Sequence, residues 1–346
     1  MSLKGISLDG LILVPSSLVM LVGGFCKFVS PEFVPWLAVV GLLFPFALFV
    51  FVIGLVLRVS RGYWKGMIWP LVIVGCAYGD IGRTVGGIGS DAGVEGETEF
   101  SVTSFNVRRM DEYNWIDGDE TRNELFNWME NNSPDVLCLQ EFPSNMEPRL
   151  RQLLPRYSVI TISQTSGPAF VSKRKVINGG EWLPNGKARG LYADILVEDD
   201  TVRIVNVHLQ SVGLARDDYD AVRDGTDAED RKRLLGRLSS AYKLRADQAQ
   251  KLNDFIATSP YKTILAGDFN DTPISYALNC IENMNDAFTT SGSGLGATYV
   301  GDLQGLRIDY LLYSYSISCS EFTTHKIKLS DHRPIEGKFN FRAKNS

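Results

Sequence analysis

Six short stretches of the sequence carry side chains of the kinds that bind metals, phosphates and protons. They are SFNV (104–107), LQE (139–141), NVHLQS (206–211), GDFND (267–271), RIDY (307–310) and SDHRP (330–334). Each lies at or near the end of an apolar run, where a lone acid is unremarkable because turns begin there. Together they hold two of the three histidines of the chain. This combination indicates one shared site rather than six unrelated turns.

The acids of these stretches suggest a metal-dependent reaction. In one cleft, Glu141, Asp268, Asp309 and Asp331 would repel one another, which raises carboxyl pKa values unless a cation lies among them. Oxygen donors without thiolates favour Mg²⁺ or Mn²⁺, and the five cysteines have no zinc-type spacing. A hard cation with carboxylates, histidines, amides and an arginine suits the attack of water on a phosphoester.

Short apolar runs and two helical patterns must position these side chains. An alternating pattern predicts a strand over 100–107, and a continuous apolar run at 135–141 predicts a strand buried on both faces. The other predicted strands are 191–197, 202–210, 262–270, 307–314 and one after 330–334. Helices are predicted over 119–135 and 230–257, and the polar segment 211–230 is interpreted as a loop or insertion. The pattern predicts an α+β domain of two packed sheets with helices outside.

In this order, the six stretches resemble the endonuclease/exonuclease/phosphatase superfamily. The resemblance covers roughly residues 99–342. That superfamily includes pancreatic-type deoxyribonucleases, abasic-site endonucleases, inositol polyphosphate 5-phosphatases and secreted sphingomyelinases. The resemblance implies a four-layer α/β sandwich, in which two mostly antiparallel sheets are flanked by helices and the site lies at one end.

The resemblance also implies roles for the metal-binding and water-activating residues. Glu141 matches the principal metal ligand, Asn106 the asparagine that helps to hold the metal, and Asp331 a second, often water-mediated ligand. Asp268 matches the acid that positions or deprotonates the attacking water, and Asn270 matches the amide that orients the phosphate. Within the family the base is either this aspartate or the last histidine.

The remaining roles concern the phosphate. Asp309 matches the acid that pairs with His332 and fixes its tautomer, and His332 then contacts the phosphate. His208 lies where deoxyribonucleases and several phosphatases keep a phosphate-binding or acid histidine. Abasic-site endonucleases have an acid at the position of Arg108, whereas deoxyribonuclease-like members have arginine. Arg108 therefore argues against an abasic-site enzyme and a second tight metal, and Arg189 is either a second phosphate-binding arginine or a surface residue.

The first 85 residues form a membrane segment by their composition. The runs 11–29 and 34–57 are each about long enough to cross a bilayer, which takes roughly 20 helical residues. A third run at 66–79 is short, so the segment 1–85 is predicted to hold two to three transmembrane helices. Residues 86–98 are rich in Gly, Ser and acids and are interpreted as a linker.

Basic residues between the second and third runs give the orientation. Arg58, Arg61 and Lys65 place this loop in the cytoplasm by the positive-inside rule. If the third run spans, the catalytic domain is extracytoplasmic, which is the favoured placement in a multi-pass membrane protein. If the third run only lies in the interface, the domain is cytoplasmic.

Charge bears on the substrate. Residues 1–96 hold 6 of the 35 Lys and Arg residues and 5 of the 40 Asp and Glu residues. Residues 97–346 therefore have a formal charge of −6. This net negative charge argues against a protein that binds nucleic acid unspecifically, but a local basic groove stays possible.

We predict a membrane-anchored, Mg²⁺-dependent phosphoesterase that hydrolyses a phosphodiester or phosphomonoester. The alternatives are an extracytoplasmic nuclease and an inactive binding protein of the same fold.

The predicted partners follow from these alternatives. They are a phosphoester substrate (nucleic acid, phospholipid or small phosphoester) and the lipid bilayer. No obligate protein partner is evident from the sequence.

Overall fold

A computed structural model describes residues 7–64, 66–87, 99–112, 114–116, 118, 120–162, 165–182, 190–213, 228–301 and 304–341. The chain forms two compact units. The first comprises Met1–Thr84, Ser211–Gln250 and Asp271–Ile281, and the second comprises Val85–Gln210, Lys251–Asn270 and Glu282–Ser346. Every candidate site residue that the structure describes belongs to the second unit.

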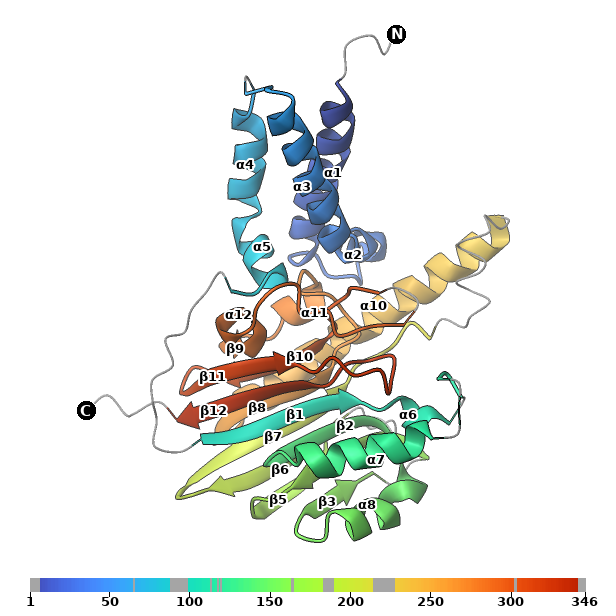
Figure 1. The fold of residues 1–346 in the computed structure, drawn as a ribbon, viewed down its shortest axis with the longest axis vertical. Helices are drawn as coiled ribbons and strands as arrows, with labels where there is room; N and C mark the ends of the chain where they lie inside the picture. The colour runs from blue at the N-terminus through green and yellow to red at the C-terminus, as the bar shows by residue number, and fades with distance from the viewer. Residues whose placement is uncertain are drawn as a thin grey trace, which may run out of the picture. The chain divides into compact units, whose positions relative to one another are not determined.

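Two six-stranded sheets make up the second unit (Figure 1). The first sheet has the order β11-β12-β1-β2-β4-β3 and contains β1 (Glu99–Asn106), β2 (Val136–Pro143), β3 (Ser158–Thr161), β4 (Ser166–Ser172), β11 (Ile317–Thr324) and β12 (Ile335–Phe341). The second has the order β5-β6-β7-β8-β10-β9 and contains β5 (Val176–Trp182), β6 (Gly190–Val197), β7 (Asp200–His208), β8 (Lys262–Asp268), β9 (Met284–Asp286) and β10 (Asp309–Ser314).

Most neighbouring strands are antiparallel. The two exceptions are the parallel pairs β1/β2 and β7/β8, one in each sheet. The apolar run of β2 is buried from Val136 to Gln140, as its sequence predicts for a central strand. The predicted architecture, two mostly antiparallel sheets flanked by helices, is confirmed.

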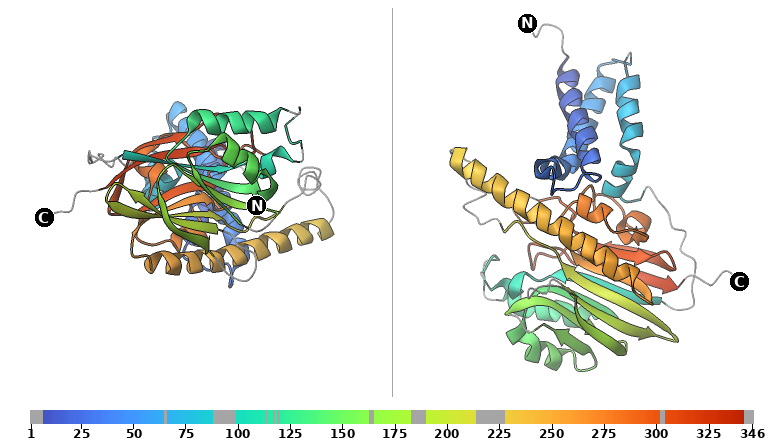
Figure 2. Two further views of the ribbon diagram at one scale, coloured as in Figure 1. Left: turned by 90° about the horizontal axis from the view of Figure 1, so that it is seen from below. Right: turned by 180° about the vertical axis from the view of Figure 1, so that it is seen from behind.

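Two hydrophobic cores hold the layers of the second unit together. Side chains of both sheets, such as Phe100 of β1 and Ile264 of β8, form the core between the sheets. On the other face of the first sheet, Phe105 and Leu137 pack with Leu125 of α7 (Thr121–Asn132) and with residues of α8 (Glu147–Leu153). Figure 2 shows α7 along the outer side of the strands. Each fully buried aliphatic or aromatic side chain contributes about 1.5–3 kcal/mol, so the sheets are a rigid support for strand ends.

A buried ion pair links β6 to β7 and gives a stability prediction. Nε and Nη2 of Arg203 donate to the two carboxylate oxygens of Asp194 at 2.7 and 2.9 Å, and the guanidinium lies over the ring of Tyr192. Arg203→Leu leaves Asp194 buried without its partner, so the free energy of unfolding is expected to fall by about 3 kcal/mol. Denaturant unfolding of the full chain measures this loss. Replacing both residues with leucine is expected to restore much of it, and an unaltered midpoint for the single variant would contradict the assignment.

The first unit is helical. Its helices are α1 (Leu8–Cys26), α2 (Pro35–Leu42), α3 (Phe44–Ser60), α4 (Ile68–Cys76), α5 (Tyr78–Thr84), α11 (Tyr276–Asn279) and most of α10 (Ala228–Ala257). α1 packs against α2 and α3. Arg58 of α3 forms an ion pair with Asp9 of α1, and Lys27, which directly follows α1, forms one with Asp80 of α5.

α1 is long and apolar enough to cross a membrane, on the criteria of length and composition. The predicted second span, 34–57, is divided into α2 and α3, which meet at a bend of 46° and meet the same criteria only as a pair. Pro45 in the first turn of α3 explains the break, because proline has no N–H to continue the hydrogen-bond ladder. The third predicted run, 66–79, corresponds to α4 and the start of α5.

The predicted chain divisions stay predictions. These are a membrane segment over 1–85, a linker over 86–98 and a catalytic domain over 99–342. Residues 88–98 of the linker and 214–227 of the predicted loop lie outside the described residues.

Candidate active site

Five of the predicted site residues lie where strands of the two sheets begin or end. Asn106 and Asp268 are the last residues of β1 and β8, His208 is the last of β7, and Asp309 is the first of β10. Glu141 lies near the end of β2. β1 and β2 run parallel, as do β7 and β8, so each pair of strands delivers its final residues to one edge.

Gly267 explains how β8 brings Asp268 beside His208. These two residues are register partners in the parallel β7/β8 ladder. Gly267 has φ +146°, and a Cβ at this position would overlap the carbonyl oxygen of Val207. A glycine before the aspartate is therefore required by the close approach of the two strands.

Asp268 is the centre of the site. Its Oδ2 accepts hydrogen bonds from Nδ2 of Asn106 at 3.0 Å and from Nδ2 of Asn270 at 3.2 Å. Its Oδ1 accepts from the backbone N–H of Asn270 at 2.7 Å. The Nε2 atoms of His208 and His332 lie 3.6 and 3.7 Å from Oδ2. The structure thus gathers four predicted residues around the carboxylate of Asp268, which is 1% exposed.

Glu141 is turned into the site by a β-bulge. The pairing of β2 with β4 shifts register between Leu139 and Phe142, and Glu141 has φ 53°. Such a bulge re-aims a side chain, and a non-glycine residue at positive φ costs about 1–3 kcal/mol that the surrounding fold must offset. Oε1 of Glu141 lies 3.3 Å from Nδ2 of Asn106 and 3.7 Å from Nε2 of His208.

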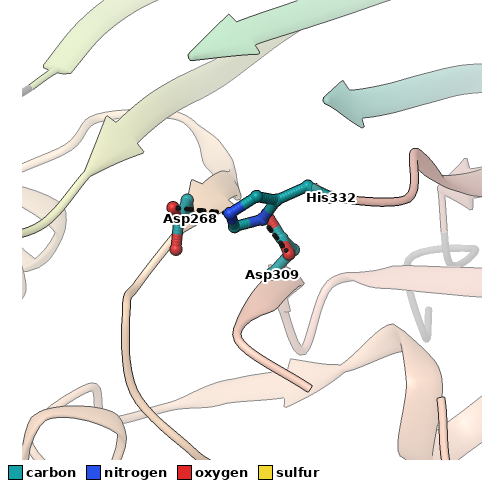
Figure 3. Close-up of side chains that lie close together, drawn as sticks. All are labelled: Asp268, Asp309 and His332. Carbon is teal, nitrogen blue, oxygen red and sulfur yellow. Dashed lines mark hydrogen bonds and ion pairs between the residues drawn. The ribbon is translucent and has the colours of Figure 1, made fainter. Parts of the chain in front are cut away.

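His332 and Asp309 form a buried pair (Figure 3). Nδ1 of His332 lies 2.9 Å from Oδ2 and 3.1 Å from Oδ1 of Asp309, and the dashed lines in Figure 3 join His332 to Asp309 and to Asp268. The ring of Tyr299 meets the imidazole edge-to-face at 5.3 Å. The carboxylate fixes Nδ1 as the protonated nitrogen, so Nε2 points at Asp268.

The electrostatics of the pair and Asp268 are coupled. Burial by itself lowers the pKa of His332, but the carboxylates of Asp309 and Asp268 more than offset it and raise that pKa well above its ordinary value. Burial also raises the pKa of Asp268, and the neighbouring Asp309 raises it further, while His332 and His208 act in the opposite direction. In the metal-free protein the charge of each group therefore acts on the pKa of the other.

Replacing Asp309 with asparagine is expected to lower the pKa of His332. In the wild type, protonation of His332 favours the folded state; this stabilisation is complete below the ordinary histidine pKa and is lost as pH rises through the higher folded-state pKa. Asp309→Asn removes the carboxylate that contributes most to raising this pKa, so the stabilisation by protonated His332 should be lost at a lower pH. NMR titration of the metal-free protein checks this, with His325, which pairs with Glu336, as the internal control. An unshifted His332 titration would contradict the role of Asp309.

Arg108 and Asp331 lie together. Nε of Arg108 is 3.3 Å from Oδ2 of Asp331, and the guanidinium lies 4.9 Å from the ring of Trp115. Arg108 begins a four-residue turn, α6 (Arg108–Asp111), in which every residue has positive φ. The guanidinium of Arg108 thus balances the negative charge of Asp331, whose carboxylate can also bind a cation. Arg189 lies outside the residues that the structure describes.

Two buried amides beneath the site were not anticipated from the sequence. Nε2 of Gln140 donates to Oδ1 of Asn206 at 2.7 Å and to Ser104 at 3.1 Å. Nδ2 of Asn206 donates to the backbone oxygens of Leu139 and Ala169 at 2.8 and 2.9 Å. The three bonds that involve Asn206 join the first sheet to the second, next to Glu141 and Asn106. An amide inside an otherwise apolar strand was the signal that could have revealed them.

Two hydroxyls likewise fix the segments that carry the buried pair. Ser330 donates to the backbone oxygen of Asn106 at 2.8 Å. Thr298 accepts from the backbone N–H groups of Ile308 and Asp309 at 3.1 and 3.2 Å.

The donor set fits a hard divalent cation. Atoms of Asp268, Asp309 and His332 lie within 4.8 Å of one another. Nδ1 of His332 is already engaged with Asp309, so Nε2 is the nitrogen of this ring that an ion could use. Glu141 and Asn106 offer a carboxylate and an amide at the same edge, and oxygen ligands of this kind are those that Mg²⁺ prefers.

Comparison with protein families agrees with this arrangement. The sequence model of the Endonuclease/Exonuclease/phosphatase family matches residues 103–332. A second model, a domain of unknown function (DUF8431), matches residues 11–84. No curated protein matches the sequence.

Solved structures share the fold of the second unit at low sequence identity. A protein of the same family from Bacteroides thetaiotaomicron has a TM-score of 0.54 at 15% identity, over 71% of this chain and 99% of that one. TDP2 of D. rerio, humanized by 14 mutations, has a TM-score of 0.53 at 16% identity, over 70% and 99%. The 3′ phosphatase NExo from Neisseria, bound to a product DNA hairpin, has a TM-score of 0.51 at 16% identity, over 70% and 100%.

The family match covers the first five stretches and the sixth as far as His332, and the structure brings their predicted site residues to one edge of the sandwich. The chain therefore belongs to the endonuclease/exonuclease/phosphatase family, and it is an enzyme of the metal-dependent phosphoric ester hydrolase class.

Proposed function

We propose that the chain is a membrane-anchored, Mg²⁺-dependent phosphoesterase that hydrolyses a phosphodiester or phosphomonoester by attack of water on phosphorus. One observation carries the proposal. The buried carboxylate of Asp268 is held between two histidines and two amides, beside the strained Glu141. Such an arrangement is costly for stability alone, which supports a catalytic role.

Glu141 and Asn106 would hold the cation, with Asp331 as a further ligand through water. When bound, Mg²⁺ supplies Lewis-acid polarisation of the phosphoryl oxygen. Nδ2 of Asn106 touches both Glu141 and Asp268, so the same amide couples the metal ligand to the proton acceptor. Mn²⁺ has similar ligand preferences and is the expected substitute.

Asp268 is the proposed base. Its pKa is raised by burial, which makes it a better proton acceptor than an exposed aspartate. Asp309 and Asp268 raise the pKa of His332 well above its ordinary value, so this imidazole is better suited to donate to a phosphoryl oxygen than to act as the base. Asn270, whose φ is 52°, is the proposed amide donor to the phosphate, and His208 a further donor.

Arg108 is the proposed cationic contact to the phosphate. Its Nη1 atom is buried and has no hydrogen-bond partner among the described residues, although Nε lies beside Asp331. A buried guanidinium N–H without a partner is rare, and a phosphate oxygen would satisfy it. Arg189 stays a predicted contact to the phosphate.

The surface of the first unit supports membrane attachment. Among the described residues, 23 of the 29 large apolar side chains that are exposed lie between Leu8 and Tyr78, whereas Asp9 and Asp80 are buried. This distribution is the reverse of that expected for a helical unit in water. We propose that α1, the bent pair α2–α3 and the third run, formed by α4 and the start of α5, cross the bilayer. Three spans put Arg58 and Arg61 on the cytoplasmic side and the catalytic domain outside the cytoplasm.

Metal removal and parallel substrates test the proposal. The full chain in detergent is assayed with bis-p-nitrophenyl phosphate, DNA, sphingomyelin and phosphoinositides, first with EDTA and then with excess Mg²⁺. Hydrolysis is expected only with Mg²⁺, and the preferred substrate identifies the physiological class. Equal turnover with EDTA and with Mg²⁺ would reject the proposed metal-dependent phosphoesterase. So would the absence of turnover on all four substrates with Mg²⁺ and with its substitute Mn²⁺.

A nuclease is the second candidate, because an aromatic ring lies beside the arginine of the site. Trp115 stacks on Arg108, and a ring next to a phosphate-binding arginine is the usual platform for an unpaired base. Among the similar structures, NExo is bound to a DNA hairpin. Trp115→Ala is expected to weaken turnover of single-stranded DNA while leaving bis-p-nitrophenyl phosphate unaffected if the chain is a nuclease.

A further inference from the structure

A cavity of about 460 Å³ lies in the second unit, outside the residues that form the active site. Phe288, Leu295 and Phe322 contribute its apolar side, and Lys326 and Arg333 contribute its charged side. None of its ten lining residues is acidic. We call this site the Arg333 cavity. Its volume is within the range of ordinary small-molecule sites, about 300–1,000 Å³.

The apolar side is preformed. The loop residue Gly296 has φ +57°, and a Cβ there would overlap the ring of Phe288, so only glycine lets the loop lie against this ring. Phe322 meets the same ring edge-to-face at 5.7 Å, and Arg307 lies over it at 4.5 Å. Leu295 is 58% exposed and forms the rim. An apolar group can therefore enter without rearrangement of the wall.

The charged side lacks compensating carboxylates. Arg333 donates from Nη1 to the backbone oxygen of Ala297 at 3.3 Å. Within the part of the chain that the structure describes, neither Lys326 nor Arg333 has a carboxylate within ion-pair distance. The neighbouring His325, in contrast, is paired with Glu336. Two uncompensated cations on one wall favour an anion there.

One short segment separates the cavity from the active site. The backbone of Arg333 donates to Thr298 at 2.8 Å, and Val300 donates to Asp331 at 2.7 Å, so this segment is paired with residues 298–300. His332 engages Asp309, whereas Arg333 lines the cavity. The cavity is thus adjacent to the catalytic histidine but shares no lining residue with the proposed site.

We propose that the Arg333 cavity binds an anionic amphiphile, in which a phosphate or carboxylate group is joined to an apolar chain or ring. The anion lies against Lys326 and Arg333, and the apolar part lies against Phe288, Phe322 and Leu295. This binding does not depend on the proposed function, because the ligand need not be the substrate. The same chemistry is available from a phospholipid of the bilayer and from a soluble phosphate ester.

Calorimetric titration of the full chain tests the proposal. The protein is held in nanodiscs of phosphatidylcholine with EDTA, and the probes are hexyl phosphate, inorganic phosphate and hexanol. Hexyl phosphate is expected to bind saturably, at least about tenfold more tightly than either fragment. Lys326→Glu should weaken it by at least about tenfold, because a charge-assisted contact becomes a repulsion. The matched control is Lys328→Glu, an exposed lysine outside the lining, which should leave the Kd unchanged.

Two results would overturn the proposal. One is an unchanged Kd for hexyl phosphate in both Lys326→Glu and the rim variant Leu295→Asp. The other is equal binding of inorganic phosphate and hexyl phosphate, which would leave the apolar side without a role. Nanodiscs that contain phosphatidic acid distinguish the two sources. A bilayer lipid in the cavity competes with hexyl phosphate there, whereas a soluble ligand binds equally in both kinds of disc.

Discussion

Replacing Asp268 with asparagine is expected to lower kcat by about 10³-fold, within the range that general-base catalysis supplies, while the chain stays folded. Asparagine has the same shape, and its oxygen can still accept from the backbone N–H of Asn270. It cannot take a proton from water. The pKa of Asp268 is raised, so its ionised form is disfavoured in the folded state, and the neutral amide should leave the metal-free protein at least as stable as the wild type.

A second buried aspartate supplies the matched control. Asp194 is as buried as Asp268 but is paired with Arg203. Asp194→Asn is expected to reduce stability and to leave kcat nearly unchanged, which is the opposite pattern. Steady-state turnover of bis-p-nitrophenyl phosphate and thermal unfolding measure both quantities. Wild-type kcat in Asp268→Asn, or an equal loss of kcat in folded Asp194→Asn, would remove Asp268 from the chemistry.

Much of the site could be predicted because its residues break a local pattern. Asn106, His208 and Asp268 are polar residues at the ends of strands whose periodicity is clear in the sequence. Gly267 before Asp268 is explained only by the structure, since the close approach of β7 depends on pairing between segments 60 residues apart. Sequence patterns identify the strands, but sheet order depends on such long-range pairing.

Other features could not be predicted because they arise from tertiary packing. The bulge that turns Glu141 into the site depends on how β2 pairs with β4. The Gln140–Asn206 hydrogen bond exists because two sheets meet there. The bend between α2 and α3 had a local signal, Pro45, but the continuous apolar run around it favoured one helix. In the first two cases a local propensity was modified by a partner distant in sequence, whereas the bend follows from Pro45 itself.

The metal site gives the second large effect, the loss of cation affinity in Glu141→Gln. Glutamine keeps the length of the side chain and can occupy the same bulge, but it removes the negative charge that a divalent cation requires. Loss of a residue that only supports a metal ligand weakens metal affinity by up to about 100-fold. Glu141 is proposed to bind the cation directly, so the Kd for Mn²⁺ is expected to rise by at least about 100-fold. Turnover at fixed Mg²⁺ should fall in parallel and should recover in part at high Mg²⁺.

This partial recovery separates a metal ligand from the base. Asp268→Asn should lose kcat at every Mg²⁺ concentration, whereas Glu141→Gln should shift the Mg²⁺ dependence of the rate. Calorimetric titration with Mn²⁺ after EDTA treatment measures the affinity directly. Glu147→Gln is the matched control, because Glu147 lies just beyond β2 and binds Arg151 and Thr161 instead of the site. If Glu141→Gln bound Mn²⁺ as tightly as the wild type, the cation would have to lie elsewhere, with Asp268, Asp309 and His332 as the next candidate set.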